Sequence, residues 1–307
     1  MSSSNTRESA DDALEQRVLA KCEFFTDVQL WPLRLKLDPE RWLRNFLPEE
    51  RLYATQLLNA FLYFSEDITS QLFEAAVRSL SLLPAFPHRL FLQAQSQWRA
   101  FLDTALFTQI TGERPNPTDS GYTFLRMARQ QLNIGQNQMM TPAETADLLL
   151  TSGPRPVVFV DDFVGSGRQC VETWKREMEL PNGNKISFEV LSTVYSMSFY
   201  YCPLISTSQG YQRLHSECPG LHIACAHVLD SRYSTFSPDS IIWPDSLRPG
   251  AEEFIFTASQ RAGIPSYKWR GFADLGLALA FAHCVPDATL PLFYWDENGW
   301  QPLIRRT

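Results

Sequence analysis

The sequence predicts an α/β protein in which a mostly parallel sheet follows an N-terminal helical layer. Two observations predict this class. Apolar residues recur at helical spacing between residues 38 and 83, and apolar β-branched runs alternate with amphipathic stretches from residue 156 onward. We therefore expect an N-terminal helical region at 1–105 and an α/β domain at 106–307.

The helical region begins with good start signals. Asp38 can cap a helix whose first turn holds Pro39, and Pro48 is followed by two acidic residues that suit the positive end of a helix. The apolar positions beyond them lie three and four apart, as in Leu57, Leu58, Phe61 and Leu62, Ile68, Leu72, Phe73, Ala76 and Leu80. The spacing predicts helices that bury one face, and a further helix at 93–106.

Residues 111–121 are dominated by Gly, Pro, Asn, Asp and Thr, which favour turns, so they predict a loop. Helices are expected at 122–132 and 142–150. Thr141 and Glu144 have capping-box spacing at the start of the second.

The C-terminal half predicts the strands and helices of the sheet. Strands are expected at 156–160, 187–195, 221–229, 275–282 and 290–295. Helices are expected at 167–180, 208–217 and 251–262. Asn298-Gly299 is a hairpin-turn dipeptide, which predicts an antiparallel return strand at 301–304.

Composition excludes several classes of protein. With 307 residues, 44% hydrophobic and 20% charged, the chain can bury a sizeable core. A net charge of −7 does not indicate direct nucleic-acid binding, and no apolar run has transmembrane length. Residues 1–12 have no signal-peptide pattern and predict a frayed end. The six scattered cysteines predict reduced core thiols, so we expect a cytoplasmic protein without membrane contact.

The residues after the 156–160 strand carry the predicted chemistry. Asp161 and Asp162 follow the apolar run, and ligands of α/β sheets bind beyond the carboxyl ends of strands. Next come Gly165, Ser166 and Gly167, where backbone can approach a phosphate at the start of a helix. Adjacent carboxylates at a strand end also occur in phosphoacceptor and metal-binding domains.

This segment resembles the type I phosphoribosyltransferase signature, in which a hydrophobic strand leads to two acidic residues and a small-residue loop. The resemblance implies a sheet of phosphoribosyltransferase type. It implies that Asp161 and Asp162 hold the ribose of phosphoribosyl pyrophosphate or a related nucleotide, act in catalysis and lie at a possible Mg²⁺ site. The implied phosphate cradle is Gly165, Ser166, Gly167, Arg168 and Gln169.

Two further stretches, 116–129 and 271–291, are similar to divergent phosphoribosyltransferase-like proteins of bacterial conflict systems, as is the segment around Trp42. The resemblance covers the chain from about residue 38 to its end. It implies a toxic effector of antiviral (antiphage) defence, as in some retrons, that acts on a nucleotide or nucleobase by glycosyl transfer or N-glycosidic cleavage. It also implies protein or ribonucleoprotein partners from the same locus.

Several single residues have two interpretations. Asp119 and Ser120 could line the ligand pocket or merely cap the helix that follows. Arg126 and Arg129 share a helix face and could bind a phosphate or be solvated. His283 at a strand end could transfer a proton or bond the backbone in a core.

The helix after the loop also presents Lys175 and Arg176, which we expect to be solvated. Two functions other than an enzyme fit the same fold. One is a nucleotide sensor without turnover, and the other is a module that binds a protein partner.

Overall fold

The computed structural model describes residues 2–83, 90–111 and 121–306, with side chains from residue 11 onward. It divides into two units, Met1–Asp67 with Ser231–Thr307, and Ile68–Asp230. The predicted boundary at 105/106 lies inside the second unit. The C-terminal chain instead packs on the N-terminal helices, since Trp42 Nε1 donates to Leu292 O at 2.7 Å.

The first unit is built on an aromatic core and a small parallel sheet. Its helices and strands are α1 (Ser2–Asp27), α2 (Pro39–Leu43), η1 (Pro48–Glu50), α3 (Arg51–Ala60), β1 (Leu62–Phe64), η4 (Ser231–Tyr233), α11 (Arg248–Ala262), η5 (Phe272–Asp274), β9 (Leu279–Phe281) and η6 (Pro291–Phe293). Strand β1 pairs with β9, and the rings of Trp42 and Phe293 stack at 5.2 Å. Asp38 and Pro39 begin α2 as predicted.

The second unit holds the main sheet. Its elements are α4 (Glu66–Ser79), η2 (Leu80–Leu82), α5 (Phe91–Thr104), β2 (Leu106–Gln109), α6 (Gly121–Leu132), η3 (Gln136–Gln138), α7 (Pro142–Ser152), β3 (Val157–Val164), α8 (Arg168–Lys175), β4 (Met178–Glu179), β5 (Lys185–Ile186), α9 (Phe188–Thr193), β6 (Phe199–Thr207), α10 (Ser208–Glu217), β7 (Leu221–Ile223) and β8 (His227–Leu229). The strand order is β2-β3-β6-β7, β8 also pairs with β6, and every pairing is parallel. The predicted α/β class with a mostly parallel sheet is confirmed.

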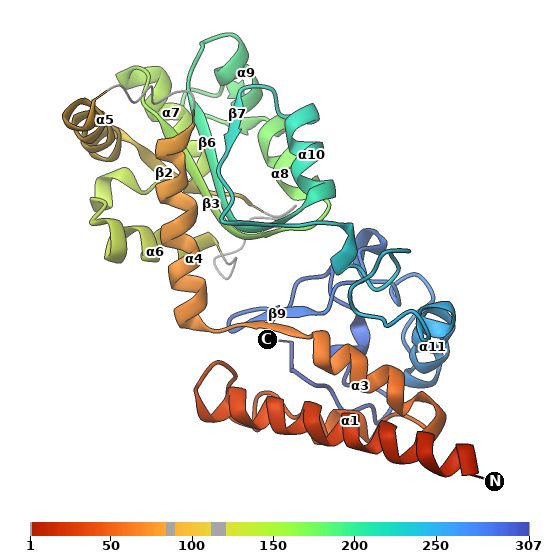
Figure 1. Ribbon diagram of the computed structural model, residues 1–307. Coiled ribbons are helices and arrows are strands. Elements are labelled where there is room, and N and C mark those ends of the chain that lie inside the picture. The colour runs from red at the N-terminus through yellow and green to blue at the C-terminus, as the bar shows by residue number, and fades with distance from the viewer. Residues whose placement is uncertain (1, 84–89, 112–120, 307) are drawn as a thin grey trace. The chain divides into compact units, whose positions relative to one another are not determined.

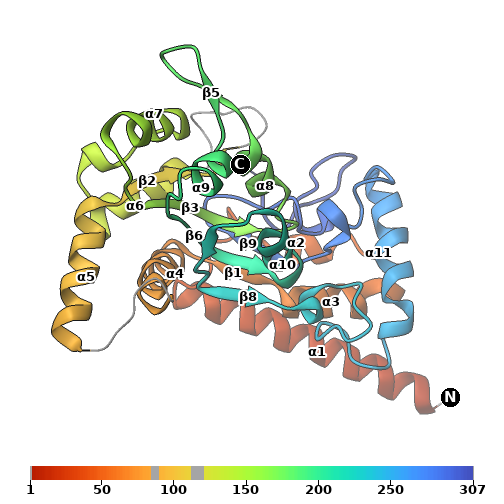
Figure 2. The ribbon, with the colours of Figure 1, turned by 90° about the horizontal axis from the view of Figure 1, so that it is seen from above.

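Helices cover both faces of this sheet (Figures 1 and 2). On one face, Phe159 and Phe199 join a core formed with α7, α8, α9 and α10. On the other face, the ring of Phe101 from α5 meets Tyr200 edge-on at 5.3 Å. Burial on both faces explains why β3 and β6 read as continuous apolar runs.

Several predicted strands are wrong. Residues 187–195 contain helix α9, because the Ser187 hydroxyl accepts from Val190 N and caps a helical turn there. The neighbouring strand is β6, at 199–207. The 290–295 segment holds the short helix η6, and the 301–304 return is reduced to one antiparallel bridge, from Ile304 to Leu37.

Other strands and helices differ in extent. The predicted strand at 221–229 is two strands, and that at 275–282 shortens to β9. Strands β1 and β2 were not expected. Helix α10 has its predicted bounds, whereas α8 ends five residues before the predicted end at Leu180.

The six cysteines form no disulfide, and Cys22, Cys170, Cys202 and Cys218 are buried, as predicted for core thiols. Within the described residues, no helix combines the length and the apolar character that crossing a membrane requires.

Candidate functional site at the carboxyl end of the second unit's sheet

Strand β3 extends further than the sequence predicted and beyond its neighbour β2. It continues through the two carboxylates to Val164, because β6 stays paired with it as far as Val164↔Ser206. Strand β2 ends at Gln109, opposite Val160. The carboxylates therefore lie just past a step in the sheet, where no β2 residue pairs with β3.

Asp161 points into the core beneath α8. Its Oδ2 accepts a hydrogen bond of 2.8 Å from the Tyr201 hydroxyl, and its Oδ1 accepts one of 3.0 Å from Asp162 N. Burial, followed by the Asp162 carboxylate, raises the pKa of Asp161 well above its ordinary value, against the lowering effect of these two donors. Burial, and then Asp161, likewise raises the pKa of Tyr201. These contacts indicate an internal, supporting place for Asp161.

Asp162 follows directly, and a side-chain hydrogen bond between the two carboxyls is among the causes that raise the pKa of Asp161. Asp162 lies at the carboxyl end of the sheet, beyond the last residue of β2. It is 7% exposed. The structure thus gives Asp161 two internal hydrogen-bond donors, and the ribose-binding role of both carboxylates stays a prediction.

The loop from Gly165 to Gly167 leads directly into α8. Gly167 has φ +75°, a left-handed conformation that favours glycine, and it is the N-cap residue of the helix. The Ser166 hydroxyl accepts from Arg168 N at 3.4 Å, and the first amides of α8 have no acceptor inside the helix. Such an end suits an anion, which fits the predicted phosphate cradle.

The N-terminus of α10 packs against the loop and hydrogen-bonds to it. Thr207 Oγ1 donates to Gly165 O at 2.6 Å and accepts from Gly210 N at 3.0 Å. A Cβ at Gly210 would lie 2.2 Å from Gly165 O, so only glycine fits. Neither Thr207 nor Gly210 was singled out from the sequence, since the loop and its support are more than 40 residues apart.

Side chains along α8 have partners of their own. Arg168 forms an ion pair with Glu172 at 3.2 Å, and Lys175 pairs with Glu217 at 3.6 Å. Gln169 O accepts from Thr173 Oγ1. The expectation of a solvated Arg176 is wrong, because its Nη1 donates to Thr111 Oγ1 at 2.9 Å and the side chain lines a cavity.

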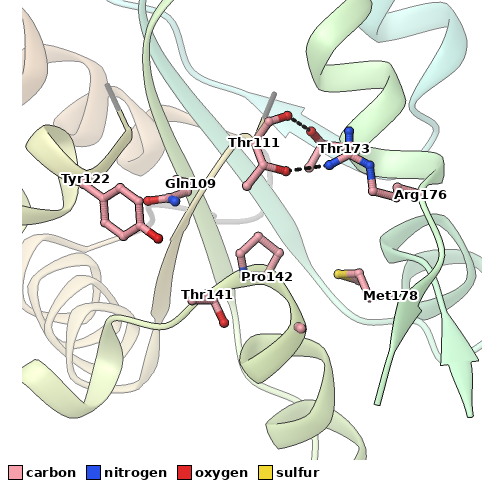
Figure 3. Close-up of a pocket in the computed structure, with 9 residues that line it drawn as sticks. Gln109, Thr111, Tyr122, Thr141, Pro142, Thr173, Arg176 and Met178 are labelled. Carbon is pink, nitrogen blue, oxygen red and sulfur yellow. Dashed lines mark hydrogen bonds between the residues drawn. The ribbon is translucent and has the colours of Figure 1, made fainter. Parts of the chain in front are cut away.

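That cavity, of about 180 Å³, lies at the end of β2 and is shown in Figure 3. Gln109, Tyr122 and Thr141 line both this cavity and an adjoining one of about 340 Å³. Arg126 and Arg129 line the larger cavity together, as their shared helix face predicted, and Glu144 lines it too. Binding of a phosphate by the two arginines stays a prediction.

Asp119 and Ser120 lie outside the described residues. His283 follows β9 in the first unit, where its ring centroid lies 5.4 Å from that of Phe281. Its catalytic role stays a prediction.

The carboxylates offer limited support for a Mg²⁺ site. Both oxygens of Asp161 accept protein hydrogen bonds, so the pair does not present two open carboxylates. Asp162 alone fits the role of a single carboxylate that holds Mg²⁺ together with a substrate's phosphates.

Comparison with protein families agrees with the fold. The family model PRTase-CE matches residues 39–306. No curated protein sequence matches the chain. The match covers most of the chain, including the sheet, the two carboxylates and the loop before α8. The chain therefore belongs to the PRTase-CE family, and its sheet is of phosphoribosyltransferase type.

Proposed function

We propose that the chain is a phosphoribosyltransferase-like effector of an antiphage defence system that acts at the ribose C1′ of a nucleotide. One observation supports the ligand assignment. Asp162 lies beyond the end of β2 and is followed closely in the chain by the glycine loop that leads into α8. The defence role is supported by the resemblance to conflict-system proteins, and we expect protein or ribonucleoprotein partners from the same locus.

In this proposal the 5′-phosphate lies on the Gly165–Gly167 loop and the first amides of α8. Asp162 accepts from the ribose hydroxyls and stabilises positive charge developing at C1′. The bond from C1′ to the leaving group breaks with its electron pair. An acceptor N–H or water supplies the pair for the new bond and gives its proton to the leaving group or to solvent.

Asp161 has a positioning role in the proposal. Its bonds to Tyr201 and to Asp162 N fix the backbone that presents the Asp162 carboxylate. Bound Mg²⁺ would supply charge neutralisation at the substrate's phosphates, with Asp162 as its protein ligand.

One observation favours a nucleotide sensor as the second candidate. Both carboxylate oxygens of Asp161 already accept hydrogen bonds from the protein, so the two carboxylates are not equally placed to meet a ligand. A sensor would bind the nucleotide and release it unchanged.

The test is to induce the wild type, Asp162→Asn and the control Asp147→Asn in bacteria, with and without neighbouring genes, and to profile nucleotides and nucleic acids. Asp147 is a carboxylate of α7, away from the loop. Nucleotide loss or base release with the wild type and Asp147→Asn, but not with Asp162→Asn, supports the enzyme. Identical profiles under triggering conditions, combined with nucleotide binding by the purified protein, would establish the sensor.

A further inference from the structure

The cavity at the end of β2 contains a polar group whose hydrogen-bonding capacity is unused. Gln109 is 2% exposed, and its Oε1 has no hydrogen-bond partner among the described residues. Leaving a buried amide oxygen unpaired costs about 1–3 kcal/mol, and such groups in native proteins call for an explanation. Gln109 is one of the residues that line the cavity.

The walls around this carboxamide are flat and apolar. The rings of Tyr122 and Pro142 and the thioether of Met178 line the cavity together with Gln109 (Figure 3). The polar side chains Thr111, Thr141, Thr173 and Arg176 also line it. An apolar cavity with a few convergent polar groups is typical of a small-molecule site.

We infer that this cavity binds a nucleobase. A carboxamide presents a donor and an acceptor side by side, which matches the adjacent acceptor and donor on the edge of a base such as adenine. An aromatic side chain provides the face on which a base stacks. Neither feature would be needed for a phosphate or a sugar alone.

The position fits the same reaction, and to that extent the inference rests on the proposed function. Helix α8 begins at the loop, while Thr173 and Arg176 near its end line the cavity. At 1.5 Å per residue, Thr173 lies about 8 Å along the helix from Arg168. One helix thus connects the proposed phosphate loop with the base cavity.

The test measures two ligands separately by calorimetry on the full chain. Adenine, guanine, cytosine and uracil probe the cavity, and ribose 5-phosphate probes the loop. The variants are Gln109→Leu, Tyr122→Ala and a matched control, Gln130→Leu, which changes an exposed glutamine of α6. Tyr122 is 41% exposed, so its removal should leave the core intact.

We expect at least one base to bind, with about tenfold or greater weakening in Gln109→Leu and Tyr122→Ala. Gln130→Leu should bind the base like the wild type, and ribose 5-phosphate should bind all four proteins equally. If no base binds the wild type, or if Gln109→Leu binds it with unchanged affinity, the inference is overturned.

A different result would overturn the proposed function alone. Ribose 5-phosphate that fails to bind, or that binds Asp162→Asn as well as the wild type, would contradict the loop assignment. If base binding still depended on Gln109 in that case, the inference of a base-binding cavity would remain supported.

Discussion

The loop after β3 and the cavity at the end of β2 lie at the same end of one sheet, but they differ in how far their polar atoms are hydrogen-bonded within the protein. The loop is supported from behind, where Gly165 O accepts from Thr207 and packs against Gly210. In the cavity, the Gln109 amide oxygen has no partner within the described chain. The difference suggests a rigid cradle, shaped before binding, next to a recognition site that only a ligand completes.

The largest effect should come from Gly210→Ala. The added Cβ would lie 2.2 Å from Gly165 O and 2.8 Å from a methyl group of Val164, both in well-packed positions. We expect a loss of about 3 kcal/mol or more in unfolding free energy, measured with denaturant. The control Gly183→Ala, with φ +81° and open space around it, should cost about 1 kcal/mol. Equal losses would mean that the loop is not rigidly supported.

The next largest effect should be on the pH dependence of the unfolding free energy. The unfolded carboxyl of Asp161 ionises near its ordinary pKa of 3.8, and the folded one at a higher pH. Between these values the folded state holds a proton that the unfolded state has released, so stability falls as pH rises, by up to about 1.4 kcal/mol per unit. Asp161→Asn should flatten this decline in denaturant unfolding from pH 4 to 8. An unchanged slope would argue against the internal placement of Asp161.

A pair of buried glutamines sharpens the comparison. Gln138 donates to Leu102 O and Ala105 O and accepts from Gly135 N, so Gln138→Leu should cost about 2 kcal/mol in thermal or denaturant unfolding. Gln109→Leu removes an unpaired amide oxygen and should leave stability unchanged or slightly higher. Comparable losses in the two variants would show that the carboxamide of Gln109 serves the fold and not a ligand.

The smallest effect is expected for Tyr201→Phe. The change removes the 2.8 Å hydrogen bond to Asp161 and should cost about 1 kcal/mol. In an Asp161→Asn background the cost should shrink, as a double-mutant cycle would reveal. Tyr195→Phe, at a position 52% exposed, is the control and should be neutral. Additive losses would contradict coupling between the tyrosine and the carboxyl.

Local signals explain what could be predicted from the sequence. The apolar run before Asp161 predicted a buried strand, and the glycines after it predicted the loop, because both depend on neighbouring residues. What the sequence could not reveal depends on residues far along the chain. The length of β3 is set by pairing with β6, and the burial of Asp161 depends on Tyr201, 40 residues away. The unpaired amide of Gln109 becomes visible only once its surroundings are known.

Thr207 also has a consequence for how the protein folds. Its single hydroxyl caps α10 and holds Gly165 O, so the loop's shape depends on a residue 42 positions later. Contacts of such separation form only after the intervening chain has been closed into a loop, which costs entropy. The pairing of β3 with β6 spans the same separation, so refolding followed by fluorescence and by ligand capture should show the sheet's core and the loop forming together.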